Sequence, residues 1–297
     1  MFQKILCVGM NCFDIIQICK NYPLEDSEQR STEYRMQRGG NASNNSTVLS
    51  LLGSICEFMG TISKNTFWEF IQKDFEKYSI DISGCKIYYE SQFPVSTIII
   101  NDQNGSRTIV HSNKDLPELD YEHFKKINLK NYSWIHFEGR NVSQVLKMMK
   151  SVNDYNNACG HPITISVELE KRKEALSLAE LADIVFVGKE FSNTYNWDGM
   201  ETTLREMRKH VKSSSTTISI WGDQGAMATG PEGTFSSPAY PPAKVIDTLG
   251  AGDTFIAGFI HCMSRGKDLK ESLHLACKIA GFKVGTYGYD ELKNFKE

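Results

Sequence analysis

Residues 247–255 read Asp247-Thr248-Leu249-Gly250-Ala251-Gly252-Asp253-Thr254-Phe255 and follow a short apolar stretch that ends at Ile246. Two glycines flank an alanine, so the backbone can turn tightly and come close to a ligand. Gly252 and Asp253 then begin a helical pattern, and the first N–H groups of a helix have no partner inside it. These donors and the helix dipole form a site for an anion such as phosphate. A carboxylate there, that of Asp253, could take a proton from an attacking hydroxyl; the simpler alternative is a helix N-cap.

The overall composition is that of a protein with room for one large core. The chain has 297 residues, of which 40% are hydrophobic and 23% are charged. Its formal net charge is −3, which gives no basic surface for nucleic acid or for an anionic membrane. No stretch approaches the ~18 consecutive apolar residues of a membrane span. We therefore expect neither a nucleic-acid nor a membrane partner.

The cysteines and the N-terminus indicate a reducing compartment. The eight cysteines are scattered without a Cys-x-x-Cys pair, which argues against a zinc site or a disulfide framework. Residues 1–9 are typical of a buried first strand and are too short for a signal peptide. We therefore expect a cytoplasmic protein with reduced thiols.

From Tyr132 onward, strand-like and helix-like stretches alternate. Strand-like stretches at 134–139, 163–168, 183–187 and 217–221 alternate with helical patterns, including one at 175–181. This alternation predicts an α/β fold in which a doubly wound parallel sheet has helices on both faces. In such sheets ligands bind at the carboxyl ends of the strands. The residues that stand at or beside these predicted ends are Asp14, Gly40, Gly139, Gly188, Gly222 and Gly250.

The N-terminal third differs because it is rich in hairpin signals. Residues 96–100 and 108–110 are β-branched runs, and the segment 101–106 between them carries an Asn-Gly turn signal. We interpret two insertions, at about 11–38 and 93–115, as a small β-sheet flap. The flap would belong to a single domain that spans residues 1–297.

Polar residues in this N-terminal third are candidates for ligand binding. Asn41 and Asn44 follow Gly40 and lie three apart on one helix face, where their amides offer both donors and acceptors, as a polyol requires. Asn41 or Ser43 could instead cap the helix. Asp14 has apolar neighbours, and the residues alone favour equally an acid in a ligand site and an exposed acid on an edge strand.

Gly39-Gly40-Asn41 and the 247–253 stretch together resemble the two signatures of the ribokinase-like (PfkB) carbohydrate kinases. Within that family, residues 22–28, 105–109, 134–141 and 241–255 are more narrowly similar to the ketohexokinase branch of animals. The resemblance implies a three-layer fold with a mostly parallel sheet and a β-lid. It also implies that ATP, with Mg²⁺, phosphorylates the C1 hydroxyl of D-fructose to give fructose 1-phosphate. Two lids would pair in a homodimer.

The resemblance further implies a role for each matching position. Asp253 corresponds to the catalytic base, and Arg107 would reach the phosphates from the lid, although a solvated hairpin arginine is the alternative. The anion hole corresponds to Gly250, Ala251 and Gly252. The sugar site corresponds to Asp14, Gly40, Asn41 and Asn44, together with Asp253. The residues expected to lie along the nucleotide are Gly222, Asp223, Gln224 and Gly225.

The chain departs from the family pattern in one motif. Many members carry Asn-x-x-Glu after the strand that corresponds to 183–187, where it organises magnesium and its waters. Here Gly188-Lys189-Glu190-Phe191 stands instead, so the residues that organise Mg²⁺ are unknown. A need for a monovalent cation such as K⁺ is left open.

Two alternative functions are compatible with these motifs. The first is another kinase of the family that acts on ribose, another hexose or a nucleoside such as adenosine. The second is a catalytically silent sugar or nucleotide sensor, since a fold does not fix a function. The presence of Asp253 with both glycines, Gly250 and Gly252, argues against the silent sensor.

Overall fold

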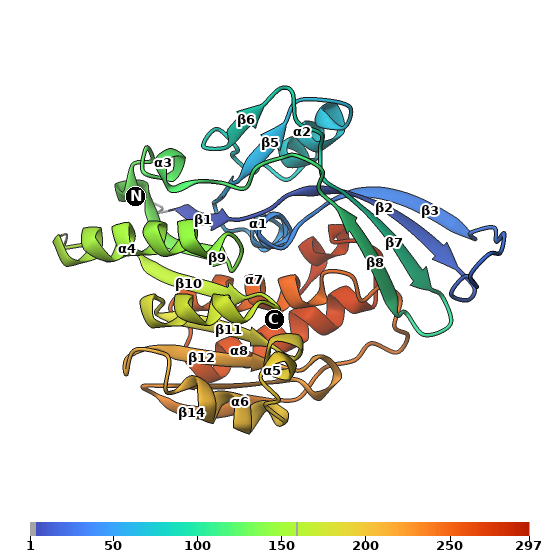
Figure 1. The fold of residues 1–297 in the computed structure, drawn as a ribbon. Helices are drawn as coiled ribbons and strands as arrows, with labels where there is room; N and C mark the ends of the chain where they lie inside the picture. Colours follow the sequence, from blue (N-terminus) through green and yellow to red (C-terminus); the bar gives the residue numbers. More distant parts are fainter. Residues whose placement is uncertain (1–3, 159, 297) are drawn as a thin grey trace.

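An eight-stranded sheet lies at the centre of the structure, a computed structural model that describes residues 4–158 and 160–296 (Figure 1). Its strand order is β14-β13-β12-β11-β10-β9-β1-β4, and the strands from β4 to β12 are parallel. This confirms the predicted mostly parallel sheet. The antiparallel edge formed by β13 and β14 was not predicted. The strands are β1 (Lys4–Val8), β4 (Cys56–Met59), β9 (Tyr132–Glu138), β10 (Thr164–Leu169), β11 (Ile184–Gly188), β12 (Thr216–Ile220), β13 (Ala226–Gly230) and β14 (Gly233–Ser237).

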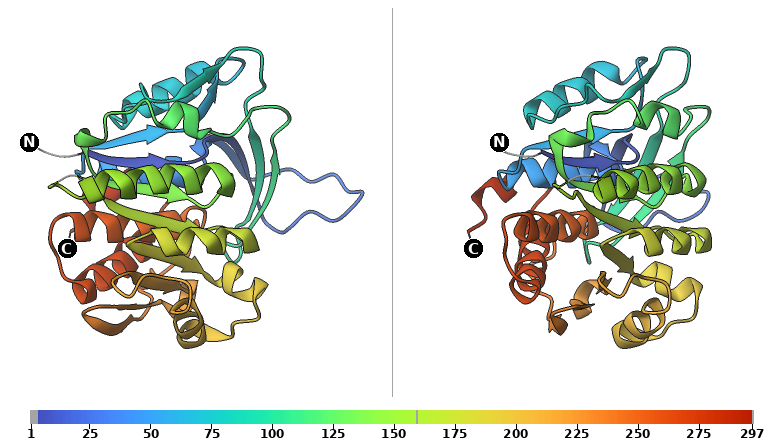
Figure 2. Two further views of the ribbon diagram at one scale, coloured as in Figure 1. Left: turned by 60° about the vertical axis from the view of Figure 1, so that its left-hand side comes forward. Right: turned by 90° about the vertical axis from the view of Figure 1, so that its left-hand side faces the viewer.

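Helices cover both faces of this sheet, as the alternation predicts. Successive residues of a strand point to opposite faces, so Ile5 and Cys7 join one core while Leu6 and Val8 join the other. Figure 2 shows α7 and α8 on one side of the sheet and α4 on the other. The α-helices are α1 (Asn41–Leu51), α2 (Trp68–Lys77), α3 (Tyr121–Phe124), α4 (Val142–Ala158), α5 (Lys189–Thr194), α6 (Gly199–Met207), α7 (Ala251–Ser264) and α8 (Leu269–Val284).

Shorter 3-10 helices connect several of these elements. They are η1 (Leu129–Asn131), η2 (Lys173–Leu181), η3 (Gly222–Gln224) and η4 (Asp290–Asn294). The helix expected at 175–181 is therefore the 3-10 helix η2, and its buried residues Ala175, Leu178 and Ala179 pack under α4 in the second core. Cys159, one of the cysteines considered above, lies outside the described residues.

A second, four-stranded sheet of order β3-β2-β7-β8 begins where β1 ends; we call it the lid (Figure 1). It contains β2 (Cys12–Cys19), β3 (Glu33–Gly39), β7 (Val95–Asn101) and β8 (Arg107–Ser112). A two-stranded sheet pairs β5 (Thr61–Ser63) with β6 (Lys86–Tyr88). The inner face of the lid rests on the segment just before α7, because Leu249 of that segment packs in one apolar cluster with Ile16, Ile18, Ile98 and Ile100.

Candidate active site

The N-terminus of α7 has the geometry expected of an anion hole. Gly250 is the N-cap with a φ of 71°, in the left-handed region that glycine adopts readily, and no side chain caps the helix. A Cβ on Gly252 would meet no atom within 4 Å, so the backbone there is open to a ligand. The N–H groups of the first turn can therefore receive a phosphate. The alternative that Asp253 is the N-cap is wrong, because Asp253 is the third residue of the helix.

The Asp253 carboxyl group is buried at this helix end, with the residue 8% exposed. Asn44 Nδ2 donates a hydrogen bond of 2.6 Å to Asp253 Oδ2, and Asn45 Nδ2 donates one of 2.9 Å to the Asp253 backbone oxygen. Burial raises the pKa of Asp253 to about 6; the Asn44 bond opposes this rise, and the negative charge of Glu170 adds to it. A carboxylate with a pKa just below neutral pH is suited to act as a general base.

Asp14 faces a similar environment from the lid. It lies on β2 with β3 on one side and β7 on the other, so the edge-strand alternative is wrong. The side chain is buried, and burial raises its pKa to about 6 against the lowering effect of hydrogen bonds from Cys12 and Ser96. A Cβ on Gly39 would lie 2.1 Å from Asp14 Oδ2, so the glycine makes room for this carboxyl group.

The first turn of α1 supplies two amides to the same region. Gly40 is the N-cap of α1 with a φ of 99° and no side chain caps the helix, so the expectation that Asn41 or Ser43 caps it is wrong. Asn41 Nδ2 donates to Glu168 Oε2 at 3.2 Å and to Glu170 Oε1 at 2.9 Å. Asn41 and Asn44 therefore both point toward acids that surround the N-terminus of α7.

Three glutamates at this edge of the sheet were missed by sequence reasoning. Glu138 ends β9, Glu168 lies on β10, and Glu170 follows it. Burial and the charge of Glu170 raise the pKa of Glu138 to about 8, while burial and the charges of Asp253 and Glu170 raise that of Glu168 well above its ordinary value. In the sequence, only their position at predicted strand ends indicates a site. Solvated acids are also common at such positions, so this feature does not distinguish them.

Unpaired buried atoms gather around these residues. Glu138 Oε2 accepts from the backbone N–H of Met10 at 2.8 Å, whereas Glu138 Oε1 has no hydrogen-bond partner among the described residues and only a loose ion pair with Arg140 Nη1 at 3.8 Å. A buried polar group without a partner destabilises a protein by roughly 1–3 kcal/mol, so such groups indicate a missing ligand. Most of these atoms are acceptors, which suits a ligand rich in hydroxyl donors. Others near the N-termini of α1 and α7 are Asn11 Oδ1, Asn44 Oδ1, Asn45 Oδ1, the Tyr289 hydroxyl and the donors Nε and Nη1 of Arg35.

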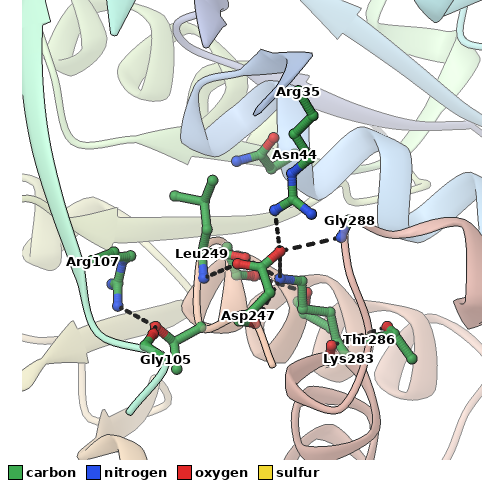
Figure 3. A network of polar contacts seen from close by, with 12 residues as sticks. Arg35, Asn44, Gly105, Arg107, Asp247, Leu249, Lys283, Thr286 and Gly288 are labelled. Carbon is green, nitrogen blue, oxygen red and sulfur yellow. Dashed lines mark hydrogen bonds and ion pairs between the residues drawn. The ribbon is translucent and has the colours of Figure 1, made fainter. Parts of the chain in front are cut away.

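A charged network lies directly before the N-terminus of α7 (Figure 3). The carboxylate of Asp247 pairs with Arg35 Nη2 at 2.5 Å and with Lys283 Nζ at 3.1 Å. Lys283 is 0% exposed, and its ammonium group also donates to the backbone oxygens of Asp247 and Leu249. Burial lowers the pKa of Lys283 to about 8 despite the charge of Asp247. Burial alone would raise the pKa of Asp247, but Lys283, Arg35 and backbone N–H groups lower it below its ordinary value.

The expected phosphate clamp lies beside this network. Arg107 is the first residue of β8 and is exposed. Its Nη1 donates to Thr248 Oγ1 at 3.2 Å, which places the guanidinium group next to the segment that leads into α7. The glycine turn 222–225 lies at the carboxyl end of β12. Gly222 has a φ of 56° with open space beside it, and Asp223 and Gln224 are exposed. Gly225 is needed by the chain itself, since a Cβ there would lie 2.1 Å from the Ser237 oxygen.

These groups fit a nucleoside triphosphate, but no residues are assigned to hold its metal ion. The open N-terminus of α7 and the Arg107 guanidinium group provide donors and positive charge for phosphate oxygens. Within residues 4–158 and 160–296, no group of three or more His, Cys, Asp or Glu side chains is arranged to hold a metal ion. We therefore derive no step through Mg²⁺ or K⁺. No helix in the same residues is long and apolar enough to cross a membrane.

Known proteins share both the sequence and the fold. A family model described as pfkB family carbohydrate kinase matches residues 3–294. Ketohexokinase of Mus musculus is 40% identical over 292 residues, which cover 97% of this chain and 98% of that protein. Ribokinase of Dictyostelium discoideum is 25% identical over 308 residues, with 97% and 96% covered. The structure of ribokinase from Giardia lamblia has the same fold, with a TM-score of 0.83 at 16% identity over 98% of this chain and 95% of that one. The chain therefore belongs to the pfkB family of carbohydrate kinases and has the ribokinase-like fold.

Proposed function

We propose that this protein transfers the γ-phosphoryl group of ATP to the C1 hydroxyl of D-fructose and releases fructose 1-phosphate. The observation that carries the proposal is the buried Asp253 carboxylate, which Asn44 holds at the open N-terminus of α7. Membership of a family of carbohydrate kinases supports the reaction type. The 40% identity to a protein named ketohexokinase supports the acceptor.

The proposed reaction gives each of these groups a role. Asp253 accepts the proton of the C1 hydroxyl as that oxygen forms its bond to the γ-phosphorus, and the bond from this phosphorus to the bridging oxygen breaks so that ADP leaves. The N–H groups at the start of α7 stabilise the negative charge on the transferred group, and Arg107 adds positive charge. A magnesium ion that accompanies ATP would supply further positive charge for the phosphate oxygens, and no residue of this chain is assigned to hold it. Asp14 and the amides of α1 orient the sugar under the lid, which excludes water as a competing acceptor.

An acceptor panel tests this function. The purified protein is incubated with ATP, Mg²⁺ and, separately, fructose, ribose, glucose or adenosine, and ADP release is followed. The highest kcat/KM with fructose supports the proposal, and ¹³C NMR of the product then distinguishes phosphorylation at C1 from phosphorylation at C6. A higher kcat/KM with ribose or adenosine would show that fructose is not the preferred acceptor, while the proposed phosphoryl transfer would stand. ATP binding without ADP release for every acceptor would favour the silent sensor.

We also propose that the outer face of the lid pairs with a second copy of this chain. Tyr34, Met36 and Val110 are exposed there, with Val110 64% exposed. Met36 pairs in register with Ile15, and Val110 with Thr97, so both point away from the buried inner face of Ile16 and Ile98. Light scattering should give twice the chain mass for the wild type and a smaller mass for Val110→Lys. A monomeric wild type at micromolar concentration would contradict this assembly.

A further inference from the structure

Three consecutive residues before the proposed anion hole contact the lid, each by a different kind of interaction, and Figure 3 shows the polar ones among these contacts. Asp247 forms an ion pair with Arg35 of β3. Thr248 Oγ1 donates a hydrogen bond of 2.9 Å to the backbone oxygen of Gly105, in the turn between β7 and β8. Leu249 packs in the apolar cluster on the inner face of the lid. The next three residues form the proposed anion hole, so the lid docks on the segment that leads directly into it.

Arg35 is the charged member of this docking surface. It pairs in register with Ile16, which puts it on the inner face of the lid, and its side chain is 17% exposed. Its guanidinium group also lies 5.0 Å from the ring centroid of Tyr287, in the segment after α8. Arg35 therefore joins the lid both to the 247–249 segment and to the chain that follows α8.

The Asp247 carboxylate, which contacts Arg35, also accepts hydrogen bonds from backbone N–H groups. Its Oδ1 accepts the N–H of Leu249 at 2.9 Å, and its Oδ2 accepts the N–H of Gly288 at 3.2 Å. Lys283 of α8 forms an ion pair with the same carboxylate and donates hydrogen bonds to the carbonyl oxygens of Asp247 and Leu249. Lys283 thus joins the segment to α8, and Arg35 joins the same carboxylate to the lid.

We propose that Arg35 is a positioning residue for phosphoryl transfer, which acts through Asp247 to bring the N–H groups at 250–252 into their working geometry when the lid rests on the segment. Donors that stabilise a developing charge act only when they are held in place beforehand, and a misplacement of about 1 Å can reduce a rate about 100-fold. This inference rests on the proposed kinase function. It adds that the position of the lid and the order of the anion hole are coupled through one ion pair.

The matched variants are Arg35→Met, Arg35→Lys and, as a control, Arg30→Met. Arg35→Met keeps the length of the side chain and removes its charge, so we expect kcat to fall about 10- to 100-fold. The KM for the sugar and the affinity for a non-hydrolysable ATP analogue should change much less. Arg35→Lys should recover part of kcat, because it restores the charge but not the planar fork. Arg30 is exposed on the loop between β2 and β3, and its replacement should leave kcat unchanged.

Hydrogen exchange separates a positioning role from a merely structural one. With the sugar and ATP analogue bound, the amides of 247–252 should exchange faster in Arg35→Met than in the wild type, while those of β10 and β11 stay the same. Wild-type kcat in Arg35→Met, or unchanged exchange at 247–252, would overturn the inference. A loss seen only as a raised KM for ATP or sugar would also overturn it and make Arg35 a direct ligand contact. A wild type that phosphorylates no acceptor would reject the proposed function instead, while the exchange comparison would still test the coupling.

Discussion

Asn44 Nδ2 lies 2.6 Å from Asp253 Oδ2, so one hydrogen bond joins the first turn of α1 to the first turn of α7 across 209 positions of sequence. An N–H donor favours the ionised form of a carboxyl group, and this bond therefore opposes the rise in pKa that burial causes. The second amide, Asn45 Nδ2, fixes the backbone at the same residue. Asp253 is thus held in one orientation and is mostly ionised at neutral pH.

The first prediction concerns Asp253 as the proposed base. Asp253→Asn keeps the size of the side chain but removes its ability to accept a proton, so kcat should fall by about 10²- to 10⁴-fold. Binding of a non-hydrolysable ATP analogue should stay within a few-fold of the wild type, because the N–H groups of α7 are unchanged. Steady-state kinetics and calorimetry check the two parts. Turnover close to that of the wild type would remove Asp253 from the role of base.

The second prediction concerns pH. As the proposed base, Asp253 must be ionised, and because its pKa is about 6, kcat/KM for the sugar should fall as the pH drops below about 6. The negative charge of Glu170 contributes to the raised pKa of Asp253, so Glu170→Gln should move this acid limb to lower pH. Glu174→Gln, at an exposed position, serves as the control. An acid limb that stays in place in Glu170→Gln would show that another group controls it.

The third prediction concerns the turn before α7. The backbone at Gly250 has a φ of 71°, which an alanine adopts only with strain, and a Cβ there would lie 1.9 Å from the Tyr289 hydroxyl oxygen. Gly250→Ala should therefore lower the free energy of unfolding by at least about 1–2 kcal/mol, the strain of a left-handed residue. Tyr289→Phe removes the colliding oxygen, so the double variant should be more stable than the sum of the single effects predicts. Urea unfolding of all four proteins gives this coupling, and additive effects would contradict the collision.

Local motifs made the geometry at the start of α7 predictable. The turn 250–252 and Asp253 lie within a few consecutive residues, where glycine conformations and the start of a helix can be inferred from sequence. The alternation of apolar runs likewise predicted the parallel sheet. The strands β13 and β14 escaped prediction because their sequences, with small residues and terminal glycines, lack a long β-branched run.

The supporting half of the site could not be predicted in this way. Arg35 contacts Asp247 across 212 positions, and Asn41 contacts Glu170 across 129. Such contacts depend on how the lid and two strand ends meet in space. The burial of Lys283 and its ion pair with Asp247 could not be predicted either. A lysine in a helical pattern is normally solvated, and no residue close to it in the sequence indicates a partner.

The last prediction concerns that lysine. Lys283→Met removes one partner of a buried ion pair and leaves two carbonyl oxygens unpaired, so it should lower the free energy of unfolding by about 3–5 kcal/mol at pH 7. The folded-state pKa of Lys283, about 8, is below the ordinary 10.5, so between these values the folded wild type binds fewer protons than the unfolded chain. The contribution of Lys283 to the free energy of unfolding therefore rises with pH between about 8 and 10.5. The difference in unfolding free energy between wild type and Lys283→Met should grow above about pH 8. Lys270→Met, exposed on the same helix, should show neither effect, and a difference that shrinks with rising pH would contradict a lysine that is charged and destabilised by burial.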